Sequence, residues 1–194
     1  MMLDPLILRG LALAYGLLFT LSALHKLGDT QRFRFILSDY RILPEPVLGT
    51  ASRLLPVLEC LLGIGWLAVA VLLSAPALLV VSSALLLIVY AGAIAMNLQR
   101  GRAYIDCGCQ FGRSARSLTG TALPQQLTWW LVARNLLLTA LMLTVLTGTT
   151  GRQIGLIDHL TLAPALLVLV LMYAAFNQLS SNQGAIASWR TPHA

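Results

Sequence analysis

Long apolar runs separated by short polar segments dominate this chain of 194 residues. Four runs, at residues 5–24, 54–73, 76–98 and 127–146, approach the length of about 20 residues that a helix needs to cross a bilayer. A fifth run, at residues 160–176, is just long enough. A span must satisfy its backbone polar groups internally. The pattern therefore predicts an all-α, polytopic transmembrane helical bundle of four core spans plus a fifth.

The segments between the runs indicate how the spans are connected. Residues 30–53 mix charged, aromatic and aliphatic side chains at helical spacing, which predicts an amphipathic helix at the interface, ended by Pro44 and Pro46. Residues 74–75 alone separate the second and third runs, so these spans should form an antiparallel hairpin. The small residues expected to bring these two helices close together are Gly63, Gly65, Ala68, Ala91, Gly92, Ala93 and Ala95.

Composition supports the membrane interpretation. Hydrophobic residues make up 58% of the chain and charged residues only 10%, whereas soluble domains carry about 25% charged residues. A net charge of +6 suits anionic lipid headgroups, and no nucleic-acid partner is expected. The first run lacks a small-residue cleavage site and should remain as an anchor. We expect one transmembrane domain over residues 1–179 and a polar tail over residues 180–194.

The basic residues are unevenly divided between the two sides of the predicted bundle. With five spans, residues 30–53, the loop after the third span and the tail share one side. The basic residues on that side are Lys26, Arg32, Arg34, Arg41, Arg53, Arg100, Arg102, Arg113, Arg116 and Arg190. The opposite side carries Arg9 and Arg152. The positive-inside rule therefore assigns the loop after the third span to the cytoplasmic face.

That loop contains the motif Asp106-Cys107-Gly108-Cys109. A disulfide between cysteines separated by one residue closes a small, strained ring, and strain raises its reduction potential. Gly108 supplies the backbone freedom of a tight turn, and nearby cations such as Arg100 favour the reactive thiolate. Thiol–disulfide chemistry is one interpretation. An inert pair of thiols and half of a zinc site are the alternatives, although four zinc ligands are not found nearby in sequence.

Ionisable residues also occur within the apolar runs. Glu59 lies in the second and Arg134, followed by Asn135, in the fourth, at depths comparable to that of Lys26. Charges at such depth usually face the bundle and pair, so one carboxylate between two cations is expected. These groups either lock helix packing or line a cavity, where positive charge would stabilise a thiolate or a reduced quinone. Cys60 adjoins Glu59.

Several motifs occur together in a fixed order. They are His25-Lys26, Tyr40-Arg41-Ile42-Leu43-Pro44, Pro56 with Glu59, Asn97-Leu98-Gln99-Arg100-Gly101, Asp106-Cys107-Gly108-Cys109, Phe111-Gly112 and Arg134-Asn135. Over residues 17–146 this set resembles the methylamine-utilisation protein MauE family, which is related to the DoxX-like membrane proteins. Gln110 departs from the family pattern, in which Phe-Gly often follows the second cysteine directly.

The resemblance implies a role in maturing methylamine dehydrogenase, whose periplasmic small subunit carries several disulfides. It also implies a location in the bacterial inner membrane and a thioredoxin-like, MauD-like partner. A periplasmic partner opposes the charge rule, so the side of the cysteine loop stays open. Cys107 and Cys109 are the expected catalytic residues. The supporting residues are Gly108, Asp106, Lys26, Glu59, Arg134, Asn135, Arg100 and Cys60.

Three functional hypotheses follow. The first is a thiol–disulfide oxidoreductase that exchanges with the thioredoxin-like partner; no cofactor is fixed by the sequence, and a quinone is the candidate electron carrier. The second is a non-catalytic chaperone or export factor for the same client. The third is a small-solute transporter, which neither a broken helix nor an internal repeat supports.

Overall fold

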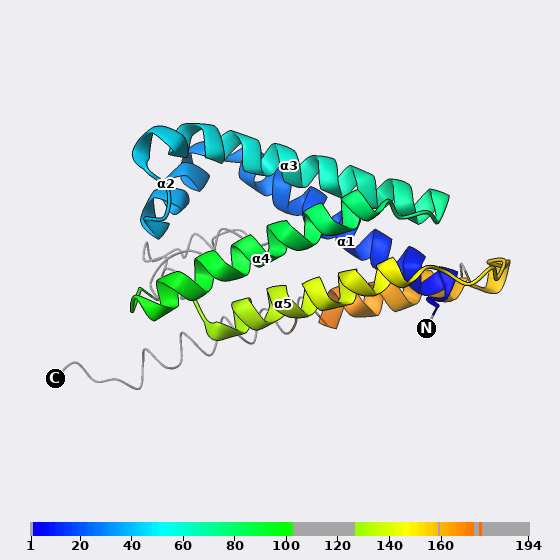
Figure 1. Cartoon of the computed structure of the whole chain (residues 1–194). Coiled ribbons are helices and arrows are strands. Elements are labelled where there is room, and N and C mark those ends of the chain that lie inside the picture. Colours follow the sequence, from blue (N-terminus) through cyan, green and yellow to red (C-terminus); the bar gives the residue numbers. More distant parts are fainter. Residues whose placement is uncertain (1, 103–126, 159, 173–174, 176–194) are drawn as a thin grey trace, which may run out of the picture.

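The structure is a computed structural model that describes residues 2–102, 127–158, 160–172 and 175. The regular elements of these ranges are helices (Figure 1): α1 (Pro5–Gly28), α2 (Thr30–Tyr40), α3 (Glu45–Leu72), α4 (Ala77–Gln99), α5 (Trp129–Leu143) and the 3-10 helix η1 (Thr144–Thr147). Four helices, α1, α3, α4 and α5 continued by η1, are long and apolar enough to cross a membrane. The predicted all-α, polytopic fold class is confirmed.

Two helix boundaries differ from the prediction. The helix α2 ends at Tyr40 because Arg41 adopts a left-handed conformation with φ of 47°. The expectation that Pro44 and Pro46 end the amphipathic helix is wrong. Pro44 is instead the N-cap of α3, and Pro46 lies in the first turn of α3. Proline is well tolerated there, because the first turn of a helix has no intrahelical acceptor for its N–H groups. Residues 45–53 therefore belong to α3.

The fifth apolar run forms a helix within Leu156–Met172, which is shorter than the four long helices and runs across His159, outside the described residues. Leu162 of this segment lies against Gly10 of α1, where an added Cβ would be 3.4 Å from its side chain. The fifth crossing over residues 160–176 stays a prediction.

The helices pack as two antiparallel pairs, α1 with α3 and α4 with α5 (Figure 1). A Cβ added at Gly63 would lie 2.4 Å from Oγ1 and 2.8 Å from the backbone N of Thr20, so α1 and α3 are in backbone contact there. The prediction that Gly63 and its small neighbours bring α3 and α4 together is wrong at Gly63, which faces α1, and at Gly92, which faces open space. It is correct at Gly65, which faces Leu79 of α4.

Large side chains join α3 to α4, which diverge from the turn that connects them (Figure 1). The Trp66 indole donates a hydrogen bond of 3.0 Å to Ser83 Oγ. The Tyr15 ring lies 5.2 Å from that of Trp66, and the Tyr15 hydroxyl donates to the Leu138 carbonyl at 2.7 Å. These contacts link α1, α3, α4 and α5 through one buried core. Hydrogen bonds of this kind help to hold helices together where no water competes for them.

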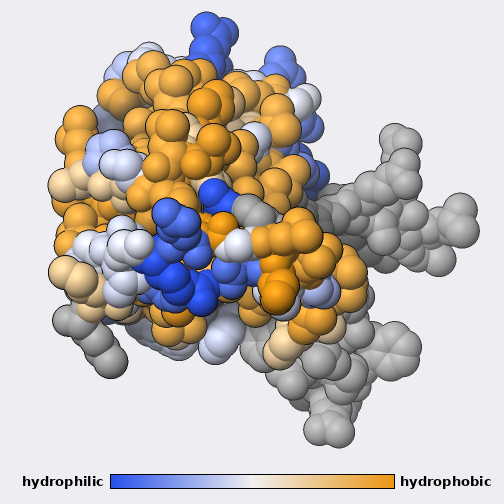
Figure 2. Space-filling model, turned by 90° about the vertical axis from the view of Figure 1, so that its right-hand side faces the viewer, coloured by the Kyte–Doolittle hydropathy of each residue, from blue (hydrophilic) through white to orange (hydrophobic). Residues whose placement is uncertain are grey.

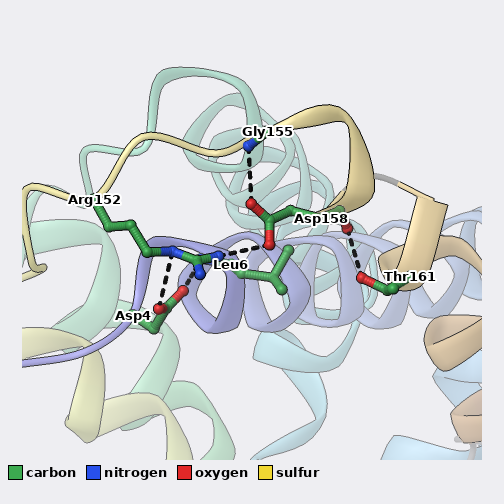
Figure 3. A network of polar contacts seen from close by, with 6 residues as sticks. All are labelled: Asp4, Leu6, Arg152, Gly155, Asp158 and Thr161. Atoms are coloured by element: carbon green, nitrogen blue, oxygen red, sulfur yellow. Dashed lines mark hydrogen bonds and ion pairs between the residues drawn. The ribbon is translucent and has the colours of Figure 1, made fainter.

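The N-terminus and the loop after η1 meet at one end of the bundle. Leu3 N donates to the Gly148 carbonyl, and Thr150 N donates to the Leu3 carbonyl, both at 2.9 Å. Arg152 lies between Asp4 (Nε to Oδ2, 3.4 Å) and Asp158 (Nη2 to Oδ1, 2.6 Å), as Figure 3 shows. Viewed from this end, apolar side chains cover most of the molecule and hydrophilic ones gather near the middle (Figure 2). The N-terminus and the loop after η1 therefore lie at the same end of the bundle.

Replacing Arg152 by alanine should loosen this end of the bundle. Each of its ion pairs is partly exposed and contributes no more than about 1 kcal/mol, so opening of the loop at residues 148–155 should increase roughly fivefold. The rate of limited proteolysis within the loop measures this change. Arg53→Ala removes another exposed arginine and is the matched control. Equal cleavage rates in both variants would contradict the role assigned to Arg152.

Candidate functional site

A buried ion pair joins α1 to α3. Lys26 and Glu59 are only 4% and 1% exposed. The Lys26 ammonium donates a hydrogen bond to Glu59 Oε1, which also accepts one of 2.6 Å from the Tyr90 hydroxyl of α4. The Ser22 hydroxyl of α1 donates to the other carboxylate oxygen at 3.2 Å. Three helices therefore contribute to one polar cluster inside an otherwise apolar bundle.

The geometry of this cluster offsets the cost of burying charge. A charge within a membrane is tolerated when it is paired and its remaining hydrogen-bonding positions are occupied. Both oxygens of Glu59 accept hydrogen bonds. The Lys26 ammonium also lies 5.1 Å from the ring centroid of Phe33 and 4.8 Å from that of Tyr90. Aromatic faces attract a cation electrostatically, so they replace part of its lost hydration.

A pocket of about 150 Å³ lies beside Lys26. Residues from α1, α2, α3 and α4 and from the turn after α2 line it, and they include Lys26, Phe33, Tyr40, Leu55 and Tyr90. Apart from Lys26 and the tyrosine hydroxyls, its wall is aliphatic and aromatic. The pocket is thus almost entirely apolar, an arrangement suited to an apolar ligand or side chain.

The structure brings only part of the predicted site together. Lys26 and Glu59 pair as expected, but Arg134 and Asn135 lie on α5, and none of the Glu59 contacts described above involves them. Asn135 is buried and faces the bundle. Arg100 caps the end of α4.

Of the three cysteines of the chain, the structure describes Cys60. Cys60, beside Glu59 on α3, is partly buried, and its thiol is free. Cys107 and Cys109, together with the predicted supporting residues Asp106 and Gly108, lie outside the described residues. Their predicted roles stay predictions.

Tyr90, Ser22 and Phe33 belong to the cluster although the sequence reasoning did not select them. Tyr90 is the one hydroxyl-bearing aromatic residue in α4, and Ser22 precedes Lys26 by one helical turn. A hydroxyl in an apolar helix, one turn from a charge, is a usable signal, because it supplies a short hydrogen-bond partner inside the bundle. Phe33 gave no such signal, since aromatic residues are ordinary in an amphipathic helix.

Four membrane-length helices, three of which meet at a buried lysine–glutamate pair, define a multi-pass helical membrane protein. The chain belongs to the MauE family, whose model, described as methylamine utilisation protein MauE, matches residues 4–148.

Individual relatives carry the same name. The methylamine utilization protein MauE of Paracoccus denitrificans is 37% identical over 147 residues, which cover 76% of this chain and 72% of the relative. That of Paracoccus versutus is 34% identical over 143 residues, 72% of this chain and 68% of the relative. That of Methylorubrum extorquens is 35% identical over 120 residues, which cover 61% of this chain and 57% of the relative. No solved structure matches the chain.

Proposed function

We propose that this protein is an inner-membrane accessory factor of methylamine utilisation that forms disulfides through Cys107 and Cys109. Its client would be the periplasmic small subunit of methylamine dehydrogenase, and its redox partner a thioredoxin-like, MauD-like protein. The observation that carries the proposal is a Cys-Gly-Cys pair within the residues matched by the family, 4–148, in a chain with little other reactive chemistry.

Electrostatics in the described part of the chain favour thiol chemistry. The arginines Arg100 and Arg102 precede the pair along the chain. Arg102 Nη1 is buried and has no hydrogen-bond partner among the described residues. Positive charge near a cysteine stabilises the thiolate, which is the nucleophile in disulfide exchange.

The proposed reaction is a two-step exchange. A thiolate of the partner attacks one sulfur of the Cys107–Cys109 disulfide, the S–S bond breaks, and a mixed disulfide forms. The second partner thiolate then attacks the partner sulfur of that mixed disulfide and releases this protein as a dithiol. The partner loses two electrons and two protons, and this protein gains them. The oxidised partner passes its disulfide to the client.

Thiol trapping with a bulky maleimide tests the proposal. In a Cys60→Ser background the pair provides the remaining thiols of the chain, so labelling reports on it alone. Untreated membranes should leave both cysteines unlabelled, and reductant should expose both together. Cys107→Ser should abolish client maturation. A partner that lacks its second cysteine should be trapped as a mixed disulfide with the unchanged pair, because it has no thiolate left to resolve that disulfide.

Labelling that does not respond to reductant, together with normal client maturation in Cys107→Ser, would contradict the redox function and support the non-catalytic chaperone. A membrane-impermeant maleimide applied to whole cells of the Cys60→Ser background, after reduction of the pair, determines the side of the loop. Labelling from outside supports the periplasmic partner, and protection from it supports the assignment by the positive-inside rule.

A further inference from the structure

The pocket between α2 and the bundle is suited to hydrocarbon. Almost all of the surface that its lining residues expose belongs to carbon atoms, including those of Phe33 and Leu37 of α2, Leu55 of α3 and Ile94 of α4. The ammonium of Lys26 bonds to its neighbours in the polar cluster and adds nothing to this character. An apolar cavity of about 150 Å³ stays dry and accepts a benzene-sized molecule, so the chamber matches about six carbons of an aliphatic chain.

The depth of the pocket corresponds to the acyl region of a bilayer. The helix α4 ends at Gln99, and its lining residues Ile94 and Val89 precede that end. With a rise of 1.5 Å per residue, they lie about 8 Å and about 15 Å along the helix from its end. Half of the hydrocarbon core is about 15 Å thick. The chamber therefore covers the depth of the acyl chains in one leaflet.

The rim of the pocket is apolar. Its exposed lining residues are Ile42 and Val89, at 38% and 53% exposure. Val89 belongs to a helix of membrane-spanning length, and Ile42 follows the amphipathic helix α2. An acyl chain of the surrounding bilayer can therefore enter the chamber without crossing a polar barrier.

Cationic side chains border the same rim along the chain. Arg41 is exposed and lies between Tyr40 and Ile42, which both line the pocket. Residues 30–43 carry three arginines and one aspartate, Asp39, and so have a net charge of +2. An arginine at the membrane surface strengthens binding of an anionic headgroup by about fivefold. A molecule with a hydrocarbon chain and an anionic headgroup therefore matches both features.

The backbone of Arg41 gives independent support for a role of its side chain. Its φ of 47° is left-handed, and the residue that usually ends a helix in this conformation is glycine. A residue with a Cβ adopts it at a cost in folding free energy that glycine avoids. Strained residues of this kind cluster at ligand-binding positions. An arginine at this position therefore indicates a function for the guanidinium.

We propose that the pocket binds an anionic phospholipid, with one acyl chain in the chamber and the headgroup phosphate beside Arg41. The site goes beyond the proposed disulfide exchange and does not depend on it. Because residues of α2, α3 and α4 line the chamber, the bound chain fastens the amphipathic helix α2 to the bundle.

Native mass spectrometry of the purified full-length protein, released from detergent micelles, measures binding. The probes are phosphatidylglycerol, which is anionic, and phosphatidylcholine with identical acyl chains, which has no net charge. Phosphatidylglycerol should bind at least about fivefold more tightly. Equal binding of the two lipids would overturn the proposal. Binding of neither would also overturn it and favour a side chain of a partner helix as the occupant.

A pair of tryptophan variants tests the chamber. Val89→Trp adds a large side chain at the rim of the pocket and should weaken phosphatidylglycerol binding at least about tenfold. Val81→Trp is the matched control, because Val81 lies on the same helix with 52% exposure and is not among the lining residues. It should bind as the original protein does. Equal binding by the two variants would show that lipid binds only to the outer surface of the bundle, and would overturn the site.

Arg41→Gly tests the headgroup contact without the risk of a misfolded variant. Glycine adopts the left-handed conformation readily, so the variant should resist SDS-induced unfolding at least as well as the original protein. Its preference for phosphatidylglycerol over phosphatidylcholine should fall about fivefold. Arg152→Ala removes an arginine at the opposite end of the bundle and should keep the full preference. An unchanged preference in Arg41→Gly would overturn the assignment of the headgroup to Arg41.

Discussion

Replacing Glu59 by leucine is expected to lower the free energy of unfolding by about 3–5 kcal/mol, the range found when one partner of a buried ion pair is removed. The Lys26 ammonium, 4% exposed, would lose its counter-ion, and Tyr90 and Ser22 would lose their acceptor. Unfolding in mixed micelles of increasing SDS content, followed by tryptophan fluorescence, measures the change.

Two further variants show whether the loss comes from the unpaired charge. The double variant Lys26→Met/Glu59→Leu should recover most of the stability, because apolar replacement of a whole buried pair is often neutral. Glu45→Gln removes an exposed carboxylate at the start of α3 and should change stability by less than about 1 kcal/mol. If Glu59→Leu is no more destabilising than Glu45→Gln, the pair does not stabilise the bundle.

Among the described glycines, Gly63 is expected to tolerate alanine least, with a loss of stability of about 1–3 kcal/mol. The new methyl group would overlap both the side-chain oxygen and the backbone nitrogen of Thr20. A side chain can rotate away, but the backbone of α1 can yield only if the whole helix moves. The same SDS titration measures the effect.

Gly92→Ala is the matched control for Gly63→Ala. Gly92 lies within α4, and a Cβ there meets nothing within 4 Å. Since alanine favours the helix over glycine by about 1 kcal/mol, this variant should be neutral or slightly stabilising. Similar losses of stability in both variants would show that the contact with Thr20 does not determine the result.

The membrane spans were predictable because length and apolarity alone determine whether a helix can cross a bilayer. The junction between α2 and α3 was not, since it depends on one residue, Arg41, adopting a left-handed conformation. A proline after an apolar segment can either end that helix or begin the next one, and Pro44 and Pro46 begin α3. The sequence is compatible with either role, and the left-handed conformation of Arg41, before Pro44, decides for the second.

Which helices pack against each other could also not be predicted from the pattern of apolar residues. Adjacency in sequence favoured α3 with α4, whereas Gly63 turns toward α1 and makes that pair the closer one. Counting residues gives the depth of a charge in the bilayer but not the face of its helix that carries it. Comparable depth correctly predicted that Lys26 and Glu59 pair. Arg134 lies on α5 and is not among the residues that bind Glu59 in the contacts given above.

The backbone bridge between Leu3 and Thr149 has a consequence for biogenesis. The first helix leaves the ribosome long before residues 148–152 are synthesised, so its starting end has no partner during most of translation. During insertion, α1 is therefore held mainly by its contacts with α3. The bridge between Leu3 and Thr149 forms only after α5 has entered the bilayer.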